Sequence, residues 1–157
     1  MSNMQFREFS PSLFQKLSEL SMAIGNGTLG QAIYHLVDIR ASQINGCAFC
    51  LDMHIKQAKI HGESDLRLFH LPVWRESHLY NDRERAALEW TEALTDLSTH
   101  KMSETLKQNI LQHLTEKELS DLSFKIGVIN MWNRLNVAFK SEPGCLDKEF
   151  GLTKSGL

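Results

Sequence analysis

Two cysteines stand three residues apart in the stretch Gln-Ile-Asn-Gly-Cys-Ala-Phe-Cys-Leu-Asp-Met-His, and a histidine follows four residues after the second. Cys47, Cys50 and His54 could form a redox-active dithiol, supply ligands to zinc, or simply pack as small and polar residues. A structural zinc site needs a fourth ligand, which remote Cys145 or a partner subunit would have to provide. The residues favour the dithiol, although a Cys-x-x-Cys spacing alone is only moderately specific.

The motif falls at the junction of two expected helices. A helical pattern over residues 29–44 ends at an Asn-Gly pair, a strong stop signal, and a second helix is expected to begin near Cys47. Both cysteines would lie in its first turn, within reach of a disulfide, and His54 would share a face with Cys50. Free N–H groups and the positive end of the helix dipole stabilise a thiolate there, so we expect a lowered pKa for Cys50.

The rest of the chain is also predicted to be helical. Further helix starts are predicted at five capping residues: Ser10, Ser64, Asn81, Ser103 and Thr115. Residues 122–139 are apolar nearly all round, which predicts a helix buried on every side. Strand patterns, repeats and linkers are not found, and the tail from Ser141 is predicted to be irregular. The predicted fold class is therefore all-α, a helical bundle in a single domain spanning 1–157.

Length and charge exclude several classes of protein. The 157 residues suffice for one domain, and 17 basic against 19 acidic residues give a net charge of -2. This balance does not favour binding to nucleic acid or to an anionic membrane, and no apolar run is long enough to span a bilayer. The N-terminus lacks a signal-peptide pattern, and three cysteines make a poor disulfide framework. We expect a cytoplasmic protein, in which a Cys-x-x-Cys is usually redox-active or metal-binding.

The chain resembles the AhpD-like alkylhydroperoxidase group of the carboxymuconolactone decarboxylase superfamily in three stretches, which read RASQINGCAFCLDMHIKQAKIHGES, WRESHLYNDRERAALEWTEAL and VINMWNRLNVAFK. The similarity covers about residues 29–143, which would be the core of the domain, and its most specific part is Asn-Gly-Cys-x-x-Cys-x-x-x-His. The resemblance implies an all-α, AhpD-like helical bundle with the Cys-x-x-Cys at the start of a helix. It also implies assembly as a homotrimer or homohexamer, and a peroxidase that requires no bound cofactor or metal.

The resemblance also implies a role for each residue of the motif. Cys50 would attack the hydroperoxide substrate, Cys47 would resolve the product as a disulfide, and His54 would belong to a proton relay. An external dithiol reductant would restore the pair. The decarboxylase branch generally lacks the paired cysteines, which argues against that activity here. The alternative is a non-catalytic oligomeric binding or scaffold protein that keeps the family fold.

His35 marks a departure from the family pattern, which carries a glutamate twelve residues before the first cysteine. Antiparallel helices would bring His35 within about one turn of His54, where a neutral imidazole could accept a proton. However, a polar stripe at helical spacing, which alone indicates a solvated face, contains His35 as well: Gln31, His35, Asp38 and Ser42. Both interpretations stay open. Because an imidazole cannot stabilise a neighbouring imidazolium as a carboxylate does, we expect weak activity toward ordinary alkyl hydroperoxides.

Overall fold

The computed structural model describes residues 5–25 and 27–157, and within these ranges it contains helices and no strand. The elements in chain order are α1 (Gln5–Phe9), α2 (Pro11–Gly25), α3 (Gln31–Ile44), α4 (Ala48–Ile60), α5 (Asp65–His70), η1 (Leu71–Glu76), α6 (Asp82–Thr95), α7 (Glu104–Leu111), α8 (Glu116–Ala138) and η2 (Leu152–Ser155). The predicted all-α fold is confirmed. None of the described helices is both long and apolar enough to cross a membrane.

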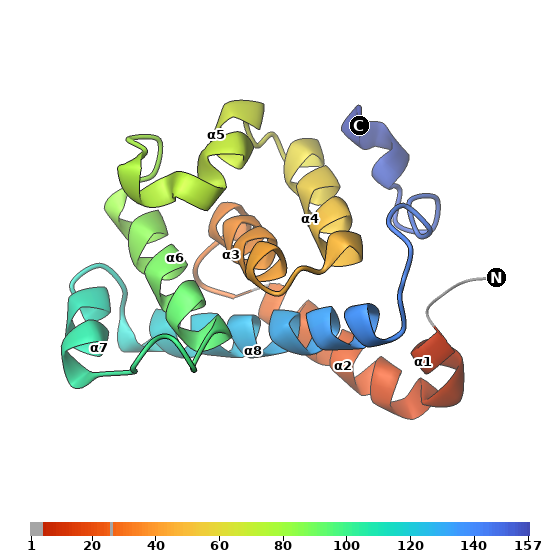
Figure 1. Cartoon of the computed structure of the whole chain (residues 1–157), viewed down its shortest axis with the longest axis horizontal. Helices are drawn as coiled ribbons and strands as arrows, with labels where there is room; N and C mark the ends of the chain where they lie inside the picture. Colours follow the sequence, from red (N-terminus) through yellow and green to blue (C-terminus); the bar gives the residue numbers. More distant parts are fainter. Residues whose placement is uncertain (1–4, 26) are drawn as a thin grey trace.

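Helix α3 lies at the centre of the fold. It packs between α4 and α6, while the long helix α8 crosses beneath these three and is lined on its other side by α2 (Figure 1). Leu36, Val37, Ile39 and Ala41 of α3 are at most 1% exposed, because α4, α6 and α8 pack against this helix. Polar side chains of α3 that point toward α4 or α8 are therefore withdrawn from water, as Asp38 and Ser42 are.

Two capping boxes fix the start of α6 and of α8. The Asn81 side chain accepts the backbone N–H of Glu84, and the Glu84 carboxylate accepts the N–H of Asn81 in return. Thr115 and Glu118 make the same reciprocal pair at α8. Each box satisfies backbone N–H groups that have no partner within the helix. Glu118 also forms an ion pair with Arg83 of α6 at 2.6 Å, so this cap ties α8 to α6.

The sequence-based prediction that residues 122–139 are buried on every side is wrong for the outer face of α8. Phe124 and Met131 are 61% and 49% exposed, whereas Leu122, Ile126 and Ile129 on the inner side are almost completely buried. Helices α2, α3, α4 and α6 contact α8 from the other directions. Among the described residues, this outer strip is left uncovered. An apolar pattern alone does not reveal which side of a helix its own chain covers.

The C-terminal segment returns to lie beside α4, whereas α1 packs on α2 (Figure 1). Helix α1, which the sequence reading did not predict, is held to the C-terminal segment by an ion pair of 2.9 Å between Arg7 and Glu149. Residues 141–157 consist mainly of turns and the short 3-10 helix η2, which packs on α4. Asp147 fastens this segment to Lys56 of α4 at 2.7 Å. The C-terminal segment therefore contacts the helix that carries the Cys-x-x-Cys motif, and α1 is tied to that segment.

Candidate active site

The turn between α3 and α4 sets the position of the cysteine pair. Gly46 has a φ of 65°, in the left-handed region that glycine adopts without strain, and this lets the chain reverse direction within two residues. Asn45 caps the end of α3 and donates its side-chain amide to Asn130 at 3.0 Å and to Asn133 at 2.9 Å. The turn is therefore fixed to α8 as well as to its own two helices, which leaves Cys47 little freedom.

Cys47 and Cys50 lie next to each other at the first turn of α4. Cys47 is the N-cap, and its Sγ accepts the backbone N–H of Cys50 at 3.3 Å. The two sulfur atoms are 2.6 Å apart, and both residues are buried free thiols. A disulfide bond of about 2.05 Å would need only a small side-chain movement. The predicted placement of the pair at the start of a helix is confirmed.

The two thiols differ in acidity. The hydrogen bond with the Cys50 thiol, together with the N–H of Cys50 and a contribution from Asn133, outweighs burial and lowers the pKa of Cys47 to about 7. The same sulfur–sulfur hydrogen bond, burial and the negative charge on Cys47 raise the pKa of Cys50. The expectation of a lowered pKa for Cys50 is therefore wrong, because its contact with Cys47 and its burial both favour the protonated thiol. Once ionised, the pair holds one proton between two touching sulfurs.

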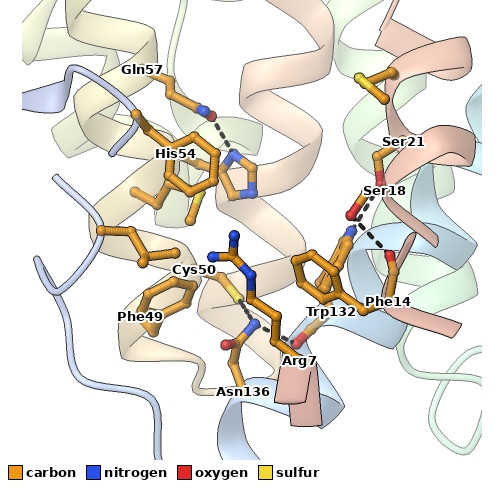
Figure 2. A pocket seen from close by; sticks show the side chains of 14 residues that line it. Arg7, Phe14, Ser18, Ser21, Phe49, Cys50, His54, Gln57, Trp132 and Asn136 are labelled. Atoms are coloured by element: carbon orange, nitrogen blue, oxygen red, sulfur yellow. Dashed lines mark hydrogen bonds between the residues drawn. The ribbon is translucent and has the colours of Figure 1, made fainter. Parts of the chain in front are cut away.

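Only one of the two cysteines faces a cavity. A cavity of about 370 Å³ lies between α1, α2, α4, α8 and the C-terminal segment, and its lining includes Cys50 and His54 but not Cys47 (Figure 2). Most of its wall is apolar, with side chains that include Phe14, Phe49, Met53, Trp132, Leu146 and Phe150. A small molecule entering here would therefore meet the sulfur of Cys50, and Cys47 lies behind it.

Several of these residues were not predicted from the sequence to line a cavity. Trp132 was expected to be a core residue, yet it lines the cavity and donates its indole N–H to Ser21 of α2 at 2.9 Å. Leu146 and Phe150 belong to the tail that was expected to be irregular, and Arg7 belongs to the unpredicted α1. An apolar residue in the core and one lining a cavity give the same pattern in a sequence, so no local signal could have separated them.

His54 lies on the same helix as Cys50 and lines the same cavity. Its Nδ1 is 2.9 Å from the side-chain oxygen of Gln57 and 3.5 Å from the Oδ2 of Asp38. Figure 2 shows this nitrogen turned toward Gln57, and the opposite edge of the ring on the side where Cys50 lies. Burial lowers the pKa of His54 and outweighs the opposing attraction of Asp38. The ring is therefore neutral near pH 7 and able to accept a proton.

Asp38 is a residue of the site that the sequence reading missed. The polar stripe taken alone indicates a solvated face for Asp38 and Ser42, but these residues are 3% and 0% exposed. The Oδ2 of Asp38 lies 2.7 Å from Nζ of Lys125, and its Oδ1 is buried without a hydrogen-bond partner. The hydroxyl of Ser42 accepts the amide of Asn133 at 3.0 Å. The solvated-stripe interpretation is wrong for these two, because Lys125 and Asn133 of α8 cover that side of α3.

His35 does not line the cavity. Its Nε2 is 2.7 Å from Nδ1 of His61, the two rings stack, and both residues line a separate hollow between α3 and α4. Burial is the main reason that the pKa of His35 falls to about 4, so the ring is neutral near pH 7. The structure brings together Cys47, Cys50 and His54. His35 lies near enough to His54 for their charges to interact, as predicted, but it contacts His61 and does not face the cavity of Cys50.

Among the described residues, no further zinc ligands are grouped around the Cys-x-x-Cys motif. Within residues 5–25 and 27–157, no three His, Cys, Asp or Glu side chains are grouped so that they could hold a metal ion. Cys145 is exposed and does not line the cavity. The arrangement that is present consists of a buried dithiol, a neutral imidazole and an apolar cavity, which suits thiol redox chemistry with an apolar reaction partner.

Comparison with known proteins gives matches over most of the chain. Residues 11–93 match the carboxymuconolactone decarboxylase family. The uncharacterised protein YdfG of Bacillus subtilis (strain 168) is 32% identical over 133 residues, which span 85% of this chain and 90% of YdfG. The crystal structure of ATU0492 from Agrobacterium tumefaciens, a protein of unknown function described as a candidate antioxidant defence protein AhpD, is 34% identical. It covers 91% of this chain and 98% of its own, with a TM-score of 0.85.

The same fold also occurs in a debrominase. The debrominase Bmp8, solved in complex with 2,3,4-tribromopyrrole, superimposes with a TM-score of 0.80 over 94% of this chain and 79% of its own. The two chains are 17% identical, so this likeness concerns the fold alone. Function has to be argued from the side chains of the site.

Proposed function

Because the chain belongs to the carboxymuconolactone decarboxylase family, and within it to the AhpD-like group, we propose that it is a dithiol peroxidase that reduces organic hydroperoxides. One observation carries the proposal: Cys50 faces an apolar cavity with Cys47 directly behind it and the neutral ring of His54 beside it. This arrangement supplies an attacking sulfur, a resolving sulfur and a proton acceptor, and it uses only groups of the chain.

The first step oxidises Cys50. The cysteine pair loses one proton, which His54 accepts. The Cys47 thiolate then takes the proton of Cys50, so that Cys50 attacks as the thiolate. Its sulfur attacks the terminal oxygen of the hydroperoxide, so that an S–O bond forms and the O–O bond breaks. Cys50 becomes a sulfenic acid, and the peroxide is reduced to an alkoxide. His54 returns the proton to this alkoxide, which leaves as the alcohol.

The second step forms the disulfide. The sulfur of Cys47 attacks the sulfenic sulfur of Cys50, an S–S bond forms, and the hydroxyl group leaves with one proton as water. An external dithiol then reduces the bridge by thiol–disulfide exchange and is itself oxidised to a disulfide. We propose a cytoplasmic setting, in which such reductants are maintained.

Peroxide consumption and disulfide mapping test this function directly. With cumene hydroperoxide and dithiothreitol, the wild-type protein is expected to consume many equivalents of peroxide. Without dithiothreitol it should consume one equivalent per chain and stop with a Cys47–Cys50 bridge and a free Cys145, as read by peptide mass spectrometry. The proposal fails if the protein consumes no more peroxide than a cysteine-free control protein, in which case a non-catalytic scaffold with the family fold remains. A dominant bridge to Cys145 would contradict the resolving role of Cys47.

The outer face of α2 and α8 leads to a prediction about assembly. Leu20, Phe124 and Met131 are all at least 41% exposed and line one shallow hollow. Together with the family resemblance, this motivates the proposal of a homotrimer or homohexamer, because such a patch is costly in water. Light scattering at micromolar concentration should give a multiple of the 18.0 kDa chain mass.

A matched pair of variants separates this face from other exposed apolar positions. Phe124→Asp is expected to lower the mass toward that of one chain, whereas Phe69→Asp on α5, where Phe69 is 76% exposed, should leave the assembly intact. A wild-type mass near 18.0 kDa would refute the assembly proposal.

A further inference from the structure

We propose that Asp38 is a positioning residue that fixes the tautomer of His54, while Lys125 compensates its charge, and this inference rests on the function proposed above. Asp38 lies on α3, one turn beyond His35, and its Oδ2 stands between Nδ1 of His54 on α4 and Nζ of Lys125 on α8. Three helices therefore contribute to one buried polar contact directly behind the cavity.

The two groups near Nδ1 of His54 differ in whether they can donate a hydrogen bond to it. Gln57 lies closer to Nδ1 of His54, at 2.9 Å, but a side-chain amide can turn either its oxygen or its NH2 group toward a ring nitrogen. An ionised carboxylate has no proton to donate. With the Oδ2 of Asp38 at 3.5 Å, the favourable state has the proton on Nδ1. The lone pair then lies on Nε2, the nitrogen on the edge of the ring that faces away from Gln57 (Figure 2).

The burial of Asp38 indicates that this carboxylate has a functional role, because it does not stabilise the fold. A carboxylate that is 3% exposed, with one oxygen left without a partner, destabilises the fold relative to a small apolar residue. The chain also provides Lys125, whose side chain is 15% exposed, to neutralise it at 2.7 Å. The charges of Asp38 and Lys125 are thus both withdrawn from water on the inner side of α3. Through Asp38 this ion pair contacts His54, which lines the cavity.

Lys125 also has a consequence for the protonation of His54. A bare carboxylate would draw a proton onto the ring, and an imidazolium could not act as the acceptor. The ion pair leaves little net charge, so burial prevails and the pKa of His54 stays below its ordinary value. The other charged or titratable groups around the ring are His35 on α3, Cys50 on α4 and Arg7 on α1. Of these groups, Asp38 supplies a negative charge at the ring while the cysteine pair is protonated, and Cys50 adds one when it is a thiolate.

Nitrogen-15 NMR of histidine-labelled protein reads the tautomer without any turnover, with His54→Gln used to assign the signal. We expect the wild type to carry the proton on Nδ1, and Gln57→Leu to keep it there. The double variant Asp38→Leu/Lys125→Met removes the carboxylate without leaving an unpaired lysine. It should lose this tautomer preference and reduce peroxide at least about tenfold more slowly, because an orienting carboxylate is missing.

Two further variants complete the design. Lys125→Met keeps the carboxylate, so it should retain the proton on Nδ1 and raise the pKa of His54 in the same NMR titration. The same double exchange at the surface ion pair of α8, Asp121→Leu/Lys117→Met, removes an Asp–Lys contact of 2.8 Å away from the cavity. It should change neither the tautomer nor the rate.

The outcomes that overturn the inference do not depend on peroxidase activity. A wild-type proton on Nε2, or a loss of the Nδ1 tautomer in Gln57→Leu, would show that Asp38 does not set it, even if the double variant fails to fold. An unchanged pKa of His54 in Lys125→Met would refute the compensating role. If the tautomer depends on Asp38 while peroxide is not consumed by the wild type, the proposed function fails and the positioning role stands.

Discussion

Cys50→Ser is expected to abolish catalytic peroxide reduction, lowering kcat/KM at least about a thousandfold, as removal of a covalent nucleophile does in other enzymes. The reason is geometric, because Cys50 lines the cavity and Cys47 does not. A serine hydroxyl has nearly the same size but cannot be oxidised by a peroxide. The measurement is the rate of cumene hydroperoxide loss in the presence of dithiothreitol, with Cys145→Ser as the matched control that should keep full activity.

Cys47→Ser should behave differently from Cys50→Ser. It retains the attacking sulfur but lacks the partner that resolves it, so it should consume one equivalent of peroxide and stop as a sulfenic acid that dimedone traps on Cys50. The reaction should also be slower than the first turnover of the wild type, because the thiolate that can take the Cys50 proton is missing. If dimedone instead labels Cys47 in Cys50→Ser, at the wild-type rate, the two sulfurs have exchanged roles.

His54→Gln is expected to lower the peroxidase rate by about a hundredfold to ten-thousandfold, the range typical of a lost general acid–base group. The reason is that its neutral ring lines the cavity with Cys50 and serves as the proton acceptor in the proposed mechanism. Glutamine keeps a polar side chain of similar length but cannot accept and return a proton. The loss is measured as the second-order rate constant with cumene hydroperoxide at pH 7.

A thiol titration separates the role of His54 from a disturbance of the cysteine pair. The lowered pKa of Cys47 arises from Cys50, Asn133 and backbone N–H groups, and His54 is not among its causes. Alkylation of the reduced pair should therefore rise with pH around a midpoint of about 7 in both the wild type and His54→Gln. Below this midpoint both thiols are protonated and unreactive. A midpoint that moves with the histidine, or an unchanged peroxidase rate, would contradict the proton-relay role.

Local features of the fold could be predicted from the sequence. The capping boxes at Asn81 and Thr115 are made between residues three apart, so nothing beyond the local sequence is needed to find them. The Asn-Gly turn likewise positions Cys47 as the N-cap of α4. In each case the interacting groups are neighbours in the chain, and the hydrogen bonds follow from helix geometry.

Features that depend on distant parts of the chain could not be predicted in this way. Asp38 occurs in a polar stripe typical of a solvated face, and its burial depends on Lys125 of α8. The cavity wall depends on the return of residues 141–157 to α4, which turn-forming residues do not specify. The order of acidity depends on the contact between the two sulfurs, on burial and on the N–H of Cys50 that Cys47 accepts, and these arise only in the folded chain.

The position of Cys47 at the helix N-terminus also bears on how quickly the proposed peroxidase would be regenerated by its reductant. A reductant that enters through the cavity meets Cys50, so its attack on the disulfide displaces the sulfur of Cys47. Thiol–disulfide exchange is faster when the departing thiol is more acidic. With a pKa of about 7, Cys47 departs as a stabilised anion that the N–H of Cys50 is already placed to bind. The residue that is shielded from the peroxide is thus the better leaving group during regeneration.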